Sequence, residues 1–503
     1  MKKPHLFWIL IDSARNYATD QDMRGLPNAV IDFANEGLYF KNVITSAPST
    51  IQSISSMMIS SPSYLLSRSY NNYRGKFDCF DYFPELLRTE GYDTVGAIYF
   101  KHGREVMSDM FGHIKRDYYP PGLTHRKEVW TNEDVYNLFK NVLKKHNWSN
   151  PTMTYLHFNV RVDDNVSDIV NGVLEDIKSN GLYDESIVLI NSDHGYPDAN
   201  KNYDFEQGLK EGWGHDKYMT NDNILTPLVI KAPGVIPEVI ETPIATIDIV
   251  PTLCSLMRIQ SSPKFHGLDV SKTSVISAER LIRTDNRYIG QTPGYFAYTK
   301  GELKVIVHRQ SKKEDIRTYY NLSEDPNEEN GKSLNSDFKD FHKECIEDEQ
   351  RLFDFHESLL SSNWKSKLKA HSKAQPENIV VILPSTDLFR SIAYKALAKV
   401  FPKSKIVFSE DVQEKKSSFD LKIYILESEI PWELKGLKAH GTGILASKEI
   451  YIDNNGEYIS KPIGLSLYWR FFSKRLSIIK NDPMFLFDLI KRVFKKRLLK
   501  PVR

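Results

Sequence analysis

The sequence has little cysteine and no long apolar run. Its only cysteines are Cys79, Cys254 and Cys345 in a chain of 503 residues. An odd number without metal-like spacing gives no basis for a disulfide framework and fits a reducing compartment, so we expect the protein in the cytoplasm. No stretch approaches the roughly 18 consecutive apolar residues that a membrane-spanning helix needs, so the sequence predicts no such helix.

A strong net charge is also lacking. Lys and Arg number 67 against 65 Asp and Glu, which leaves a formal charge of +2. A nearly neutral chain argues against a nucleic-acid partner, because positive charge gathers only at the extreme C-terminus. The N-terminal residues begin like a secretory signal peptide, but Asp12 and Arg15 interrupt the apolar run and no small-residue cleavage site follows. The segment therefore predicts a first buried strand.

Short apolar segments alternate with helical patterns along most of the chain. The segments LFWILI, SIVLIN and TPLVIKAP are rich in β-branched residues and do not alternate with polar residues, as expected for strands buried on both faces of a mainly parallel sheet. The segments FPELLRTEGY and VSDIVNGVLEDIKSNGLY carry apolar residues at three-and-four spacing and stop at Gly91 and Gly181. The pattern predicts an α/β fold with a mainly parallel central sheet.

A chain of this length exceeds one ordinary core, and its composition changes along the way. Residues 1–345 carry the α/β pattern, and residues 346–377 are charged and helix-prone, which predicts a helical linker. Residues 378–480 contain the strand patterns NIVVILPST, SKIVFSE, LKIYILES and GTGILAS, with a helix after the first, and predict a small second α/β domain of unknown role. Residues 481–503 form a basic tail.

The tail fits a basic amphipathic helix that begins near Pro483. The apolar residues at three-and-four spacing are Phe487, Ile490, Phe494 and Leu498, and the basic residues off that line are Lys491, Lys495 and Arg497. Such a helix is typical of a protein that lies on an anionic membrane surface, here the inner face of the membrane. A helix packed on the second domain with its basic face in water fits the pattern equally well.

Acidic side chains end two of the predicted buried strands. Asp12 ends the first strand, and Asp193 and His194 follow the strand VLIN. Open α/β sheets bind ligands at the carboxyl ends of their strands, and two acids with a histidine form an oxygen and nitrogen ligand set for a divalent metal. For the Asp-His pair alone, the alternative is an Asp that caps the next helix beside an incidental His.

Seven segments occur in the order of the landmarks of a known family, over residues 1–345. They are ILIDSAR, FKNVITSAPSTIQSISSMM, LLRTEGYDTVGA, GLYDESIVLINSDHG, GHDKYMTNDNILTPLVIKAPG, ATIDIVPTLCSLMRI and YYNLSEDPNEEN. This part of the chain resembles the sulfatase family within the alkaline phosphatase superfamily. The resemblance implies an α/β sandwich in which acids at strand ends hold a divalent metal that touches the nucleophile.

The resemblance also implies which residues hold the metal. Asp12 matches the ligand of the first strand, and Asp193 and His194 match the ligand pair of the later strand. Ser13 stands where many members have a second acid, and His194 stands where some relatives have Asn. An imidazole is a softer ligand than an oxygen, so the set slightly favours Mn or Zn over Ca.

The nucleophile is expected in the hydroxyl-rich stretch of residues 43–61. Family members carry Cys or Ser, then any residue, then Pro-Ser-Arg at the start of a helix. Aligning SISSMM with that helix puts Ser53 on the motif serine, which makes Thr50 the nucleophile and a metal ligand by resemblance. The alternative is that Thr50 is only a helix N-cap.

A threonine nucleophile changes the expected chemistry. The sulfatase nucleophile is a formylglycine made by oxidising Cys or Ser, and oxidation of a threonine would give a ketone instead. The position is similar to that in relatives that transfer phosphoethanolamine or phosphoglycerol through a covalent phospho-threonine. The resemblance therefore implies cleavage or transfer of a phosphate ester or diester through Thr50.

The resemblance also implies residues that contact the substrate. In WGHDKYM, His215 matches a possible acid for the leaving group, and Lys217 matches a contact to the anionic oxygens. Lys101 and His102 lie near a Lys-x-His pair of the relatives, although the register is off by a residue or two. Arg15 either contacts the substrate or pairs with a carboxylate.

Three functions follow from this pattern. The leading one is a metal-dependent phosphohydrolase or phosphotransferase that acts on an anionic ester, such as a cell-surface glycan or its lipid-linked precursor. The alternatives are a sulfuric ester hydrolase with an unmodified nucleophile and a non-catalytic relative that binds an anionic glycan. Ser13, in place of the second acid, is the feature that favours the last. The short passage from LHFNVRVDDN into the next helix predicts an open site.

Overall fold

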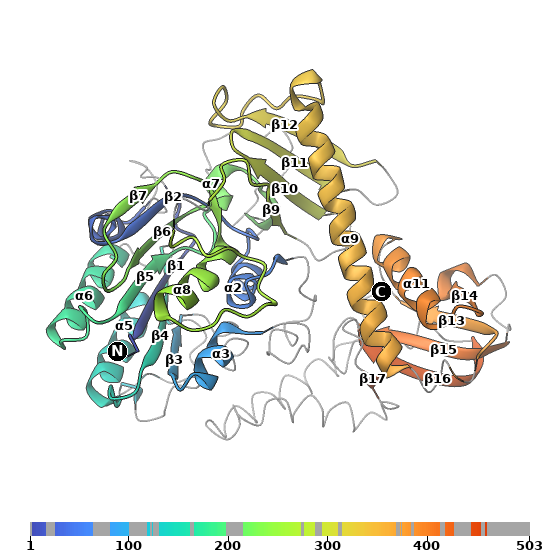
Figure 1. Ribbon diagram of the computed structural model, residues 1–503, viewed down its shortest axis with the longest axis horizontal. Helices are drawn as coiled ribbons and strands as arrows, with labels where there is room; N and C mark the ends of the chain where they lie inside the picture. The colour runs from blue at the N-terminus through green and yellow to red at the C-terminus, as the bar shows by residue number, and fades with distance from the viewer. Residues whose placement is uncertain are drawn as a thin grey trace.

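The computed structural model contains three β-sheets in the part of the chain that it describes (Figure 1). The described residues are 3–16, 26–63, 81–99, 118–120, 123, 130–160, 165–197, 215–272, 276–286, 294–309, 314–368, 373, 375–383, 387–412, 418–426, 444–453 and 458–459. Lys101, His102 and the expected tail from residue 481 lie outside these ranges.

The first sheet has eight strands in the order β3-β4-β1-β5-β6-β2-β7, with β8 also paired to β2. Its strands are β1 (Leu6–Asp12), β2 (Leu38–Ile44), β3 (Asp93–Ile98), β4 (Thr152–Asn159), β5 (Ile187–Asn191), β6 (Leu225–Lys231), β7 (Glu238–Ile240) and β8 (Ile244–Ala245). Strand β6 runs antiparallel to β5 and β2, whereas the other pairs are parallel. The predicted mainly parallel sheet is confirmed, with the segment TPLVIKAP as its reversed strand.

Helices cover both faces of this sheet. On one face lie α2 (Thr50–Ile59), α3 (Phe83–Thr89) and α8 (Ile249–Met257), and on the other lie α1 (Asn28–Phe33), α5 (Asn132–Lys145) and α6 (Val166–Ser179). Successive side chains of a strand point to opposite faces, so Leu6, Trp8 and Leu10 pack under α2 while Phe7, Ile9 and Ile11 pack under α5 and α6. Burial on both faces explains why these strands are continuously apolar.

The second sheet is antiparallel and has the order β12-β11-β10-β9. Its strands are β9 (Ile282–Asp285), β10 (Gly294–Lys300), β11 (Leu303–Arg309) and β12 (Ile316–Asn321). Helix α9 (Lys339–Lys367) starts on this sheet, where Phe341 and Cys345 pack against Phe296 and Tyr298. The helix runs for 29 residues, so the expected boundary at residue 345 falls within one continuous helix.

The C-terminal part forms the third sheet, with the order β14-β13-β15-β16-β17. Its elements are β13 (Asn378–Ile382), α11 (Asp387–Val400), β14 (Lys405–Phe408), β15 (Ser418–Leu426), β16 (Leu445–Asp453) and β17 (Tyr458–Ile459). The strand pairs are parallel except β16 with β17. Trp364 and Leu368 from the end of α9 are buried in the core of this part.

Short helical turns complete the described structure. These are η1 (Ala34–Glu36), η4 (His215–Lys217), α7 (Asn221–Ile224), η5 (Thr246–Asp248), η7 (Ser336–Phe338) and η8 (Ser409–Asp411). In the described ranges, no helix combines the length and the apolar character required to cross a membrane.

Candidate metal centre and nucleophile

The register of the central strands brings the predicted metal ligands to one face of the sheet. Asp12 is the last residue of β1, and β4 places Asn159 beside it. Leu10, two residues before Asp12, is paired with Asn191 of β5, which lies two residues before Asp193. Residues two apart on a strand share a face, so Asp12 leaves the sheet on the face that α2 covers.

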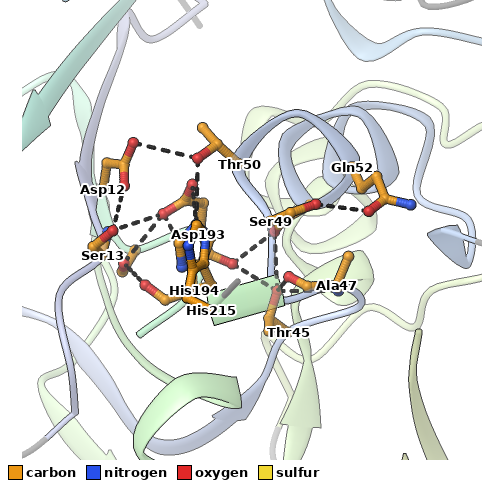
Figure 2. Close-up of polar contacts among 12 residues, drawn as sticks. Asp12, Ser13, Thr45, Ala47, Ser49, Thr50, Gln52, Asp193, His194 and His215 are labelled. Carbon is orange, nitrogen blue, oxygen red and sulfur yellow. Dashed lines mark hydrogen bonds and ion pairs between the residues drawn. The ribbon is translucent and has the colours of Figure 1, made fainter. Parts of the chain in front are cut away.

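Asp12, Asp193 and His194 converge at the carboxyl ends of β1 and β5 (Figure 2). Each offers a ligand atom, and these atoms all lie within 4.8 Å of one another. All three side chains are buried. Metal–oxygen and metal–nitrogen bonds are about 2 to 2.6 Å long, so one cation between the three atoms can reach each of them.

His194 is held with its Nε2 atom toward the other two ligands. Its Nδ1 lies 2.7 Å from the carbonyl oxygen of Gly195, and because a carbonyl only accepts, Nδ1 carries the proton. The Nε2 lone pair is then available to a metal, as in many histidine sites. Gly195 is required here because an added Cβ would lie 2.2 Å from the carbonyl oxygen of Asp222.

The two oxygens of Asp193 have different surroundings. Oδ1 accepts hydrogen bonds from the backbone nitrogens of Ser13, at 3.2 Å, and His194, at 2.9 Å. Oδ2 is buried and receives no hydrogen bond from the described residues, while His194 Nε2 lies 3.5 Å away. A buried oxygen without a donor costs free energy, and a cation at this point would satisfy it. The residues present therefore fit a divalent metal.

Ser13 joins the two acidic ligands. Its Oγ donates to Asp12 Oδ1 at 2.6 Å, while its backbone nitrogen donates to Asp193. Its backbone has a φ of 66°, a left-handed conformation that is uncommon for a residue other than glycine. Ser13 thus supplies two hydrogen bonds at the position where the resemblance puts the second acid of many members, and the described ligand set keeps two carboxylates.

The electrostatics also favour a cation. Burial alone would raise the pKa of the Asp12 carboxyl, but the hydrogen bond with His157 and the nearby His194 hold this pKa well below its usual range. Burial and the neighbouring charge of Asp12 raise the pKa of Asp193. Two buried carboxylates repel each other when both are ionised, and a divalent cation between them would stabilise both charges.

Thr50 faces this group from the first turn of α2. Its Oγ1 lies 3.4 Å from Asp12 Oδ2 and 3.3 Å from His194 Nε2. Ser49, not Thr50, occupies the N-cap position, so the alternative of Thr50 as the cap is wrong. Ser49 Oγ instead donates to Gln52, and Ser53 Oγ donates to the carbonyl oxygen of Asp193.

Two further side chains, not expected from the sequence, contact Asp12. The Tyr99 hydroxyl donates to Asp12 Oδ2 at 3.2 Å, and His157 Nε2 lies 3.3 Å from the same oxygen. His157 belongs to β4, which pairs with β1, and Tyr99 follows β3, the strand beyond β4. The sequence shows that His157 lies two residues before Asn159 and that Tyr99 follows a strand, but it does not show the order of the strands in the sheet.

The remaining predicted residues lie at different distances from the centre. The ring of His215 stacks on that of His194, with centroids 4.9 Å apart, whereas Lys217 is exposed on the same turn, η4. Arg15 is fully buried and donates to the carbonyl oxygens of Tyr196 and Pro197, so it supports the loop after the metal ligands. A substrate contact for Arg15 or Lys217 stays a prediction.

Helix α7 ties the His194 loop to the His215 turn. The Asn223 side chain donates to the carbonyl oxygens of His215 and Tyr218, each at 2.7 Å. The Asn223 carbonyl accepts from the nitrogen of Gly195 at 2.8 Å. Asn223 thus holds both segments in place, and this arrangement brings the imidazole rings of His194 and His215 together.

Comparisons with known proteins show the family and the fold. The sulfatase family model matches residues 4–160 and 164–259, about half of the chain. A search of curated proteins gives no match.

Solved structures with similar folds include three of known source. An alkaline phosphatase superfamily protein from Vibrio parahaemolyticus is 17% identical, with a TM-score of 0.51 over 68% of this chain and 84% of its own. A sulfatase structure from a study of glycosaminoglycan metabolism by Bacteroides thetaiotaomicron is 14% identical, with a TM-score of 0.53. The match covers 69% of this chain and 94% of that protein. The phosphonate monoester hydrolase of Agrobacterium radiobacter is 13% identical, with a TM-score of 0.50. The match covers 69% of this chain and 95% of that protein. At these identities the likeness shows the fold alone.

Proposed function

The chain belongs to the sulfatase family, and from that premise we propose that it is a metal-dependent enzyme that cleaves or transfers a phosphate ester or diester through Thr50. The observation that carries the proposal is the position of Thr50 Oγ1, within 3.4 Å of both Asp12 and His194. The group of two acids and a histidine supports a divalent cation, with Mn or Zn favoured slightly over Ca.

The reaction proceeds in two steps. Thr50 Oγ1 attacks phosphorus, so that an Oγ1–P bond forms while the bond to the leaving oxygen breaks. The hydroxyl proton is released to solvent as the Oγ1–P bond forms, and His215 gives a proton to the departing oxygen. When bound, a divalent cation lowers the pKa of the hydroxyl and balances the negative charge of the transferring group. In the second step, water or an acceptor hydroxyl attacks phosphorus and gives its proton to His215. The bond from phosphorus to Thr50 Oγ1 breaks, and Oγ1 takes up a proton from solvent, which restores both side chains.

A phosphorus ester suits this nucleophile better than a sulfate ester does. Threonine cannot become the formylglycine on which sulfate hydrolysis in the family depends. The phosphonate monoester hydrolase among the solved structures is named for a phosphorus ester and has the same fold. The sulfatase structure from work on glycosaminoglycan metabolism keeps a sulfuric ester hydrolase as the second candidate.

The substrate that we propose is an anionic glycan or its lipid-linked precursor, modified in the cytoplasm at the inner face of the membrane. The support is the basic pattern of the last residues, which suits anionic lipid. No nucleic-acid partner is proposed, since the chain is nearly neutral.

The test is a screen of ester classes with the purified full-length chain. Aryl phosphate, bis-aryl phosphodiester, aryl phosphonate monoester and aryl sulfate are each assayed with Mn²⁺, Zn²⁺, Ca²⁺ and no added metal. We expect turnover of a phosphorus ester, fastest with Mn²⁺ or Zn²⁺, and none with the matched Asp193→Asn variant. Turnover of the sulfate ester alone would replace the proposal by its alternative.

A further inference from the structure

The carboxylate of Asp12 is surrounded by donors on both oxygens. Oδ1 accepts from Ser13 Oγ, and Oδ2 accepts from the Tyr99 hydroxyl at 3.2 Å, with His157 Nε2 at 3.3 Å. Tyr99 and His157 thus share one oxygen and approach it from two different strands. A carboxylate held at both oxygens cannot rotate freely about its Cβ–Cγ bond.

The two side chains are themselves held in place. Asn159 donates from Nδ2 to the Tyr99 hydroxyl at 2.8 Å, so that hydroxyl has its own donor and directs its proton to Asp12. Asn159 is fixed in turn, because its backbone nitrogen and carbonyl are both bonded to the side chain of Asn132, each at 2.9 Å. The chain of contacts runs from helix α5 to the metal ligand.

The His157 ring is fixed by its neighbours. It is fully buried and lies edge-on to two tyrosine rings, with centroids 5.1 Å from Tyr99 and 6.1 Å from Tyr155. The β4 register pairs it with Ile98, the last residue of β3, which immediately precedes Tyr99. The positions of Tyr99 and His157 therefore depend on each other.

We propose that Tyr99 and His157 are positioning residues that hold the Asp12 carboxylate ready for the cation and thereby set the affinity of the site for metal. Groups that hydrogen-bond to a ligand reduce the ordering that metal binding must impose, and removing such groups in metalloproteins lowers affinity by about 10- to 100-fold. The inference rests on the metal-binding role of Asp12 within the proposed function, but it does not depend on which ester is the substrate.

The experiment measures the affinity of the metal-depleted, full-length protein for Mn²⁺ by calorimetric titration. Tyr99→Phe keeps the ring against His157 and removes only the hydroxyl, and we expect it to raise the Kd by about 10- to 100-fold. His157→Leu should also raise the Kd for Mn²⁺. His157→Gln keeps an N–H donor of similar length, so its Kd should lie between those of the wild type and His157→Leu.

Tyr118→Phe is the matched control. It removes a hydroxyl that lies 3.0 Å from His146 Nδ1, and His146 contacts Thr152 at the start of β4, whereas Asp12 lies at the end of the neighbouring β1. The control should lose stability like Tyr99→Phe and keep the wild-type Kd for Mn²⁺. Equal Kd values for Tyr99→Phe and wild type would overturn the proposal.

Turnover separates positioning from direct contact with the substrate. At saturating Mn²⁺, Tyr99→Phe should recover kcat to within a few-fold of wild type, and a kcat that stays at least tenfold lower would contradict a purely positioning role. A wild-type protein that binds Mn²⁺ but cleaves no ester would contradict only the proposed function. A wild-type protein that binds neither Mn²⁺ nor Zn²⁺ would contradict both.

Discussion

Thr50 differs from the other hydroxyl side chains of α2 in the direction of its oxygen. Ser49 Oγ bonds to Gln52, and Ser53 Oγ lies between Thr45 and the carbonyl oxygen of Asp193. Thr50 Oγ1 instead points toward Asp12 and His194 (Figure 2). Ser49 is the N-cap with an extended backbone, and Ser53 lies about one turn beyond Thr50 with its hydroxyl bonded to Thr45 and Asp193, so the segment presents a single hydroxyl to the metal ligands.

Thr50→Ala should lower kcat by about 1,000-fold or more, because the reacting oxygen is lost while Asp12, Asp193 and His194 remain. Thr50→Ser should keep part of the rate, since it retains the hydroxyl and loses only the methyl group that restrains χ1. Ser49→Ala is the control and should stay close to wild type. Peptide mapping of enzyme quenched during turnover should find phosphate on Thr50, and an adduct on another residue would contradict the assignment.

At the scale of elements, α9 is fastened to the antiparallel sheet by ion pairs. Glu349 of α9 lies 2.6 Å from Arg309 of β11 and 2.8 Å from Arg317 of β12. Lys300 of β10 lies 2.8 Å from Glu344, one turn earlier on the helix. Burial would raise the pKa of Glu349, but the charges of Arg317, Arg283 and Arg309 outweigh burial and lower this pKa.

This lowered pKa predicts a specific dependence of stability on pH. An unfolded Glu titrates near pH 4.3. The folded protein holds the Glu349 proton less tightly, so the contribution of this carboxylate is fully present above the unfolded pKa and is lost as the pH falls through the folded one. Glu349→Gln should lower the free energy of unfolding by about 2 kcal/mol at pH 7 and by less at pH 3. Urea unfolding of both proteins across this range measures the difference.

Glu347→Gln on the same helix is the matched control. Glu347 is exposed, and its nearest cation, Lys343, lies 3.9 Å away. Exposed pairs of this kind contribute little, so the control should match wild type at every pH. A constant difference between Glu349→Gln and wild type from pH 7 to pH 3 would contradict the ion-pair explanation.

At the scale of the whole molecule, α9 connects all three sheets (Figure 1). Its start packs on the antiparallel sheet, and Leu352 packs against the core beneath α2 and α8. Its end supplies Trp364 and Leu368 to the C-terminal core, and Glu357 pairs with Lys399 of α11 at 2.6 Å. The C-terminal part is therefore joined to the sulfatase-like part by a packed helix.

We expect the basic tail to act independently of the metal centre. Removing residues 483–503 should abolish binding to vesicles that contain anionic lipid and leave turnover of a small soluble ester unchanged, because every site residue lies before residue 220. Vesicle sedimentation measures the binding. The double substitution Lys491→Gln and Lys495→Gln keeps the apolar line and should weaken binding in a salt-dependent way. Equal binding by full-length and truncated protein would contradict the prediction.

The sequence by itself determined the α/β class and the strand-end positions of Asp12, Asp193 and His194. These features are local, since continuous apolar runs mark strands that are buried on both faces and motif order marks the family. The hydroxyl that faces them, Thr50, was found by aligning one helix start. The sequence pattern suggests that this helix begins near Ser53, whereas α2 begins at Thr50, three residues earlier. Helix ends depend on caps that periodicity does not reveal.

Only the tertiary structure decided which side chains surround those ligands. Tyr99 and His157 contact Asp12 because β4 lies beside β1 and β3 follows β4, and no local pattern in the sequence predicts this strand order. The reversed direction of β6, the antiparallel sheet and the full length of α9 were likewise settled by packing between segments far apart in the chain. Hydrogen-bond partners of a buried carboxylate are chosen by spatial neighbours, and a single sequence gives residue types without their neighbours.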